Sequence, residues 1–203
     1  MTEVHRPSAA VYLPELIAKV VQRYHFVQGP TAEQLLKSEI VFQIGKFDDV
    51  GIGEMRIYND GVIVSGGSNT DYLEAFLNDL LEWAKTDFGL VPIVTVKPEL
   101  HFESLFYVKS DADLLSLIRP EKAAVTAINR LWAQYPYGGE YELISAHFNI
   151  DPPNVKARRK PQQFIIERRA GTAAEENIYY SVAPFKTKDH LALLERLEAL
   201  VRG

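Results

Sequence analysis

Three side chains in this sequence have the chemistry for proton transfer: His101, Glu103 and His147. His101 and Glu103 lie two residues apart in a stretch that alternates apolar and polar residues, so on a β-strand they share one face. If His147 lies on a neighbouring strand, two imidazoles and a carboxylate meet, which suits acid–base catalysis. The outward polar face of an antiparallel sheet produces the same pattern without catalysis. We keep these three residues as catalytic candidates.

We expect no metal site and no cofactor. None of the five histidines forms a His-x-His or a His-Glu-x-x-His motif. The chain contains no cysteine, which excludes disulfides, thiolate catalysis and cysteine-ligated metals.

Positive charge gathers in one segment of the chain. Residues 154–169 include six lysines and arginines against one acid, Glu167, although the whole chain has a formal net charge of −5. The six are Lys156, Arg158, Arg159, Lys160, Arg168 and Arg169. We predict that they bind an anion, a nucleic acid or an acidic partner. The alternative is a solvated loop over 152–163 whose charges keep the neighbouring strand from pairing at its edge.

The composition is that of an ordinary globular protein. With 203 residues, 47% of them apolar and 24% charged, the chain can form a core and fits one domain over 1–203. No apolar run approaches the roughly 20 residues that cross a bilayer. The first residues also lack the pattern of a secretion signal. We therefore expect a soluble, cytoplasmic protein that does not contact membranes.

Amphipathic helices are predicted where apolar residues recur every three or four positions, over 14–24, 69–87 and 188–201. The spacing of Thr31 and Gln34 is that of a capping box, which predicts a short helical turn there.

A further helix is predicted from Asp111 to residue 134, with an interruption at Pro120. Its apolar positions predict a buried side. These positions are Ala124, Ile128, Leu131 and Trp132.

Alternating apolar residues predict strands in two parts of the chain. The first part, over 40–64, is predicted as a three-stranded antiparallel meander with turns at 51–53 and 59–61. The second set of strands is predicted over 93–96, 100–108, 144–150, 164–169 and 178–182. In the segment 144–150 the apolar positions are expected to face a core. They are Ile144, Ala146, Phe148 and Ile150.

The order of these elements predicts an α+β fold, in which a mainly antiparallel sheet is packed by about four helices in a single domain. Runs of strands alternate with single helices, and hairpin signals join the strands. That pattern differs from the regular strand–helix alternation of a doubly wound parallel sheet.

The function expected from the sequence is non-enzymatic binding or assembly through protein–protein contacts, with the protein itself or another protein as partner. The terminal helix favours a homo-oligomer, because its leucine stripe is wider than one core face needs. The alternative is that the stripe is buried between two layers of the same chain. That stripe consists of Leu191, Leu193, Leu194, Leu197, Leu200 and Val201. One alternative is an enzyme or ligand-binding protein for an anionic small molecule. Another is a nucleic-acid accessory protein that uses the basic loop.

Overall fold

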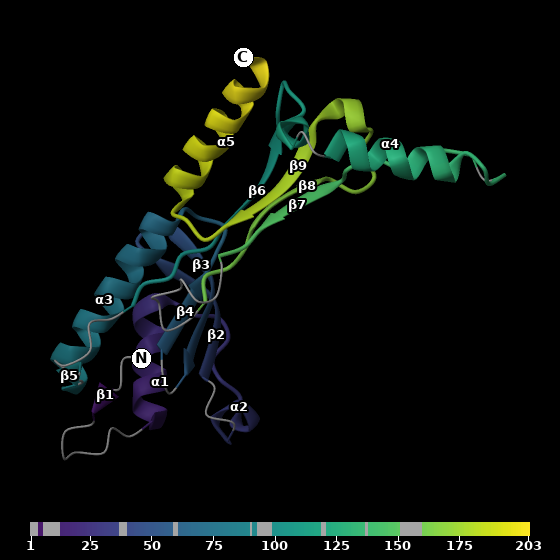
Figure 1. Ribbon diagram of the computed structural model, residues 1–203. Helices are drawn as coiled ribbons and strands as arrows, with labels where there is room; N and C mark the ends of the chain where they lie inside the picture. The colour runs from purple at the N-terminus through teal and green to yellow at the C-terminus, as the bar shows by residue number, and fades with distance from the viewer. Residues whose placement is uncertain are drawn as a thin grey trace. The chain divides into compact units, whose positions relative to one another are not determined.

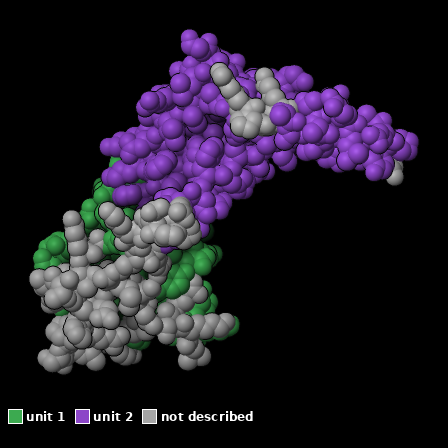
Figure 2. Space-filling view, in the orientation of Figure 1, with its two compact units in different colours: residues 1–100 green, residues 101–203 purple. Residues whose placement is uncertain are grey.

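A computed structural model describes residues 4–5, 13–36, 40–58, 61–89, 91–92, 99–118, 121–136, 138–150 and 160–203. The chain forms two compact units, unit 1 over residues 1–100 and unit 2 over 101–203 (Figure 2). Both units combine helices with an antiparallel sheet, so the predicted α+β class is confirmed. The single domain over 1–203 stays a prediction.

Unit 1 is built on an antiparallel meander of three strands in the order β2–β3–β4 (Figure 1). The prediction of this meander is confirmed. Its elements are α1 (Leu13–Tyr24), α2 (Ala32–Leu36), β2 (Ile40–Phe47), β3 (Val50–Tyr58), β4 (Gly61–Ser65) and α3 (Thr70–Phe88). A short antiparallel pair joins β1 (Val4–His5) to β5 (Val91–Pro92).

The first turn of the meander lies at Asp48-Asp49, between the end of β2 and the start of β3. The predicted turn at 51–53 is therefore wrong, because those residues belong to β3. Gly53 marks a close approach instead. A Cβ atom there would lie 3.2 Å from the carbonyl oxygen of Ser65, so the lack of a side chain lets the chain segments meet.

Helices α1 and α3 pack on the same face of the meander and enclose the core of unit 1. Tyr24 of α1 and Phe76 of α3 meet edge to face with ring centroids 4.8 Å apart. The buried core residues are Val20, Tyr24, Phe26, Phe42, Ile52, Met55, Phe76 and Leu80.

Local hydrogen bonds set the ends of the predicted helices. The side chain of Asn69 accepts the N–H of Tyr72 and starts α3, and Gly89 ends it with a left-handed φ of 58°. The predicted capping box is also present. The Thr31 N–H donates to Gln34 Oε1 at 2.8 Å, and the Gln34 N–H donates to Thr31 Oγ1 at 3.3 Å.

Unit 2 contains an antiparallel sheet of four strands in the order β6–β9–β8–β7. Its strands are β6 (Ser104–Lys109), β7 (Ser145–Phe148), β8 (Phe164–Arg168) and β9 (Ile178–Ala183). Its helices are the 3-10 turns η1 (Leu114–Leu117) and η3 (Ala174–Glu176) and the α-helices α4 (Glu121–Trp132) and α5 (Thr187–Arg202). The predicted helix over 188–201 and the strands over 164–169 and 178–182 are confirmed. The predicted strand over 93–96 lies outside the described residues.

Helix α5 and η1 pack on one face of this sheet. The buried residues of the cluster are Leu114, Leu115, Ala146, Ile166, Tyr179 and Leu194. No described side chain of α4 belongs to the cluster. We call the face that α5 covers the inner face of the sheet and the opposite one the outer face.

Two predicted burials are wrong in unit 2. The apolar stripe of α4 is exposed at Ala124, Ile128 and Leu131, because the helix projects from the end of the sheet (Figure 1). Along β7 and its flanks only Ala146 is buried, whereas Ile144, Phe148 and Ile150 are exposed. The single helix from Asp111 is likewise replaced by η1, which Asp113 caps, and by α4.

Among the described residues, no helix has both the length and the apolar content needed to cross a bilayer.

Candidate functional site

The sheet of unit 2 does not bring the three predicted catalytic residues together. His101 and Glu103 precede β6, and His147 lies within β7. These two strands form opposite edges of the sheet. Three steps of about 4.8 Å separate them, or roughly 14 Å. The neighbouring strands on which the acid–base hypothesis depended are therefore not formed.

Three of the six predicted anion-binding residues, Lys156, Arg158 and Arg159, lie outside the described residues. Lys160 is described and exposed. Arg168 and Arg169 come at the end of β8, where successive side chains leave on opposite faces of the sheet. The side chain of one of them therefore points into unit 2, and the side chain of the other lies on its surface.

Arg168 points to the inner face and pairs with Asp113, with Nη2 and Oδ1 2.8 Å apart. Its Nη1 donates to the carbonyl of Ala174 at 2.8 Å and to the hydroxyl of Tyr179 at 3.3 Å. The Tyr179 hydroxyl in turn donates to Asp113 Oδ1 at 2.9 Å. Burial and then Asp113 raise the pKa of Tyr179 to about 12, so this hydroxyl stays protonated. Arg168 thus joins β8 to the start of η1.

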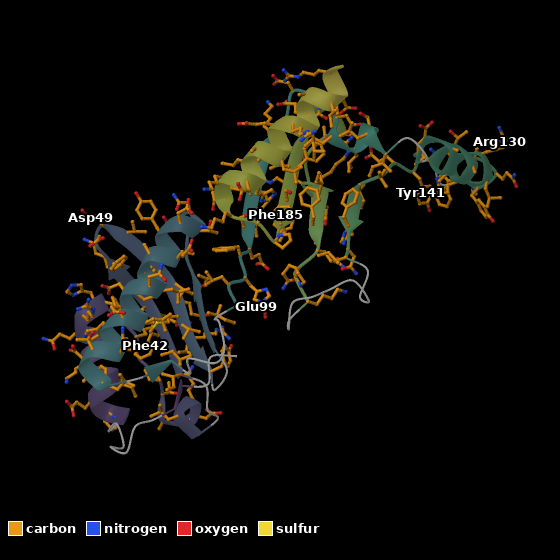
Figure 3. All side chains as sticks on the ribbon, turned by 60° about the vertical axis from the view of Figure 1, so that its left-hand side comes forward. Phe42, Asp49, Glu99, Arg130, Tyr141 and Phe185 are labelled. Atoms are coloured by element: carbon orange, nitrogen blue, oxygen red, sulfur yellow. The ribbon has the colours of Figure 1, made fainter. Side chains whose placement is uncertain are left out.

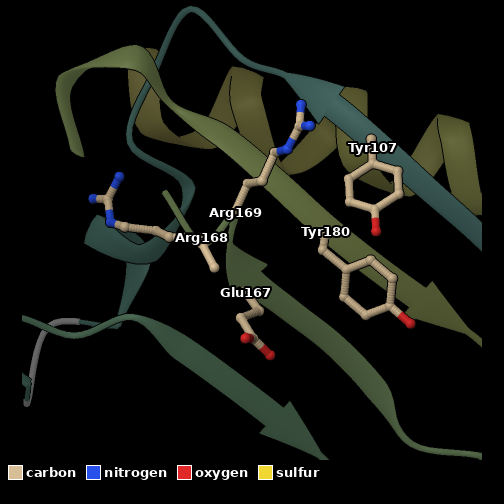
Figure 4. A pocket seen from close by; sticks show the side chains of 6 residues that line it. Tyr107, Glu167, Arg168, Arg169 and Tyr180 are labelled. Carbon is tan, nitrogen blue, oxygen red and sulfur yellow. The ribbon is translucent and has the colours of Figure 1, made fainter. Parts of the chain in front are cut away.

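Arg169 instead lies on the outer face, where its guanidinium carbon sits 5.5 Å from the ring centroid of Tyr107 (Figure 4). Tyr107 pairs in register with Tyr180, and Tyr180 with Glu167. The two tyrosine rings lie 5.5 Å apart. These four side chains, with Arg168 and Ala170, line an open concavity of about 420 Å³. We call it the outer-face concavity.

The outer-face concavity has the chemistry of a recognition surface. A guanidinium stacked on a tyrosine ring keeps its N–H groups directed outward along its plane, where a carboxylate or phosphate can accept them. Tyr107 is 65% exposed and offers a flat apolar face beside that charge. Glu167 places a hydrogen-bond acceptor on the other side of Tyr180, as Figure 4 shows.

Sequence reasoning selected Arg169 for this site and missed Tyr107 and Glu167. Of the adjacent residues Tyr179 and Tyr180, Tyr179 is buried and only Tyr180 reaches the outer face. The signal was available, because adjacent residues of a strand face opposite ways. The strand order that brings Tyr107 beside Tyr180 was not readable from spacing alone.

A buried histidine forms a second polar cluster on the inner face. His190 of α5 lies between two serines, with Nδ1 2.8 Å from Ser104 Oγ and Nε2 2.9 Å from Ser181 Oγ. Ser181 donates its own proton to the carbonyl of Ile165 at 2.9 Å. Ser181 therefore accepts from Nε2–H, and Nδ1 accepts from Ser104, which fixes the tautomer.

This Ser–His–Ser cluster is part of the core and has no access for a substrate. His190 and Ser181 are fully buried, and Ser104 is nearly so. Burial lowers the pKa of His190, since the charged imidazolium would lose its solvation. The sequence signal was the position of His190 in the helical stripe that continues with Leu194 and Leu197.

Helix α4 and the segment that returns from it form a projecting arm, over residues 121–136 and 138–144 (Figure 3, where Arg130 and Tyr141 mark it). The arm is held by its own contacts. Asn129 donates to the carbonyl of Tyr141 at 2.9 Å and accepts the Tyr141 N–H at 2.6 Å. Trp132 donates to the carbonyl of Gly138 at 3.0 Å and packs edge to face on the Tyr141 ring at 5.2 Å.

These contacts occupy one stripe of α4 and leave another exposed. Asn129 and Trp132 contact the return segment, and they lie with Val125 in a partly buried stripe. The parallel stripe of Ala124, Ile128 and Leu131 remains exposed. An ordered helix with an exposed apolar stripe has the chemistry of a protein-binding surface.

No group of three or more His, Asp or Glu side chains in the described part of the chain is placed to hold a metal ion. Comparison with protein-family models, with curated proteins and with solved structures finds no match to this chain. The function is therefore inferred from the chain's own residues.

Proposed function

We propose that this protein is a non-enzymatic binding protein that assembles with itself through protein–protein contacts. The observation that carries the proposal is the exposed apolar stripe of α4, on an arm that is ordered by its own hydrogen bonds. Apolar side chains held outward on a rigid element can bury their surface against a partner at little entropic cost. The leucines of α5 add a second apolar edge at Leu200.

Light scattering coupled to size exclusion tests this proposal, with the protein over a range of concentrations and at low and high salt. We expect a mass at least twice the 23.0 kDa of the chain. The assembly should persist in high salt, since burial of apolar surface is not screened by ions. A mass of one chain at every concentration would contradict the proposal.

The outer-face concavity favours a second candidate function, the binding of an anionic ligand. Arg169 supplies the charge and Tyr107 a stacking surface, so a phosphate or carboxylate attached to a flat group fits best. The test is titration with inorganic phosphate and with a labelled single-stranded oligonucleotide. We expect Arg169→Ala to weaken binding by about 10- to 150-fold, since a hydrogen bond to a charged group contributes about 1.5–3 kcal/mol. Equal affinity of the variant and the unmodified protein would rule out this site.

A further inference from the structure

Two apolar surfaces of unit 2 lack cover, and they belong to the same chain. On α4, Ile128 is 46% exposed and Leu131 is 58% exposed. On the inner face beside β7, Ile144 is 56% exposed and Phe148 is 52% exposed. Both surfaces were expected to be buried because their apolar periodicity is that of core-facing elements. One packing event, in which α4 covers β7, would bury both.

Unit 1 shows where a helix in this position packs. Helix α1 has 12 residues and comes ahead of the β2–β3–β4 meander, as the 12-residue α4 comes ahead of β7–β8–β9. Val20 and Tyr24 of α1 are buried in the core cluster that contains Phe42 of β2. In unit 2 the corresponding first strand is β7, where among the described side chains only Ala146 is buried and Phe148 on the same face is exposed.

Helix α5 does not cover this part of the sheet. Its His190 contacts Ser104 of β6 and Ser181 of β9, and the ring of Phe164 on β8 at 6.0 Å. It therefore lies over β6, β9 and β8. Phe148 on β7 packs against Phe164 at 5.7 Å but extends beyond the helix. The uncovered area is the β7 edge of the inner face.

We propose that α4 of one copy packs on the β7 edge of a second copy, and that the second copy returns the same contact. This inference rests on the proposed self-assembly and names its surfaces. The Ala124–Ile128–Leu131 stripe of each copy would cover Ile144 and Phe148 of the other. The two contacts are related by a two-fold axis, so the assembly closes as a dimer. The hydrogen bonds between Asn129 and Tyr141 tie α4 to its return segment, so the arm is already ordered when it meets a second copy.

The experiment uses two full-length variants, Leu131→Asp on the arm and Phe148→Asp on β7, each checked for folding by circular dichroism. In a dimer of two identical variant chains, both contacts contain the substitution. Self-association should therefore weaken at least about 100-fold. A mixture of the two variants retains one intact contact, between α4 of the Phe148→Asp chain and β7 of the Leu131→Asp chain. We therefore expect a mixed dimer in the mixture and a single-chain mass for each variant alone. Ile144→Asp replaces Phe148→Asp if the latter fails to fold.

Leu81→Asp is the matched control, because Leu81 is a helical leucine with 46% exposure on α3 and belongs to neither of the two surfaces. This variant should dimerise like the unmodified protein. Dimers of Leu131→Asp alone, or failure of the mixture to form a mixed dimer, would overturn the exchange while leaving self-assembly intact. Dimers of Phe148→Asp alone would instead point to α4 packing on α4. A single-chain mass for the unmodified protein would refute self-assembly itself.

Discussion

Units 1 and 2 both place a 12-residue helix ahead of a three-stranded meander and a longer helix behind it. In unit 1 both helices reach the sheet, and Phe42 of the first strand is buried. In unit 2 only the second helix does, and Phe148 of the first strand is exposed. The order of elements is therefore not sufficient to predict burial. A helix must also be connected so that it returns to its own sheet.

Each unit also contains a tyrosine, an aspartate and an arginine joined by hydrogen bonds, and the two clusters differ in how far the arginine is buried. In unit 1 the Tyr24 hydroxyl donates to Asp79 at 2.7 Å, and Arg23 pairs with the same carboxylate at 2.9 Å. Unit 2 has Tyr179, Asp113 and Arg168 in the same roles. The Arg23 side chain is 41% exposed, whereas that of Arg168 is 14% exposed. The aspartates rank the other way, at 30% for Asp79 and 43% for Asp113, so it is the arginine of unit 1 that water screens more.

The outer sheet faces differ as well. In unit 1 the side chain of Glu54 accepts from Gln43 at 2.9 Å and from Arg56, so the polar groups of this face satisfy one another. In unit 2 the corresponding face carries Tyr107 and Arg169 above an open concavity. Binding is therefore expected on unit 2.

The largest difference should appear when one phenylalanine is removed from each unit. Phe76→Ala in unit 1 empties a fully buried position, so it should lower the free energy of unfolding by about 3–5 kcal/mol at every protein concentration. Phe148→Ala should destabilise the protein mainly where dimers form, since Phe148 would be buried only by the partner copy. Urea unfolding at two protein concentrations measures both. If Phe148→Ala lowers the free energy of unfolding equally at both protein concentrations, Phe148 is not buried by a partner copy.

The two aspartates give the next largest contrast. Asp113→Ala leaves the mostly buried Arg168 without its carboxylate, which should cost about 3 kcal/mol, at the low end for a broken buried pair because Asp113 is partly exposed. Asp79→Ala leaves Arg23 in contact with water and should cost about 1 kcal/mol. Urea unfolding compares the two variants. An equal loss of unfolding free energy in the two variants would show that burial of the arginine does not determine how much its ion pair stabilises the fold.

The sequence predicted most of unit 1 because its signals are local. The helix over 69–87 has a wide apolar stripe and its own cap at Asn69, and the meander has regular alternation. The error at 51–53 arose because a glycine can serve a turn or a close approach between strands, and spacing does not distinguish them.

Predictions for unit 2 failed where they depended on contacts distant in sequence. The periodicity of α4 shows that Ile128 and Leu131 need cover, but it does not say which surface provides it. His101 and His147 were paired on the assumption of adjacent strands, whereas β9 and β8 lie between β6 and β7. Arg168 and Arg169 were treated as one charged patch, although strand alternation sends them to opposite faces.

Acid should destabilise unit 2 specifically, because the imidazole of His190 is buried in its core. Its pKa in the folded protein lies below the ordinary value of 6.5, so above pH 6.5 both the folded and the unfolded forms are neutral and its stabilising effect is complete. As the pH falls below 6.5 the unfolded chain binds a proton that the folded protein excludes. The free energy of unfolding should then fall by up to about 1.4 kcal/mol per pH unit.

Urea unfolding between pH 7 and pH 5 measures this slope, and His190→Gln should reduce it. His25→Gln, which replaces an exposed histidine of unit 1, is the control for a histidine substitution outside the core. An unaltered slope in His190→Gln would assign the acid sensitivity to other groups.

The smallest contrast lies at the starts of the two long helices. Asn69 caps α3 through its side chain, whereas α5 starts at Lys186 without a side-chain cap. Asn69→Ala should therefore cost about 1 kcal/mol. Lys186→Ser should raise the free energy of unfolding by less than about 1 kcal/mol. A serine can accept an N–H of the first turn, but the substitution also removes the ammonium that lies 4.9 Å from the Phe102 ring. Hydrogen exchange of the first turn of each helix measures these changes locally. We expect faster exchange in the first turn of α3 for Asn69→Ala and slower exchange in the first turn of α5 for Lys186→Ser. Faster exchange in both variants would mean that the Phe102 contact stabilises α5 more than a serine cap does.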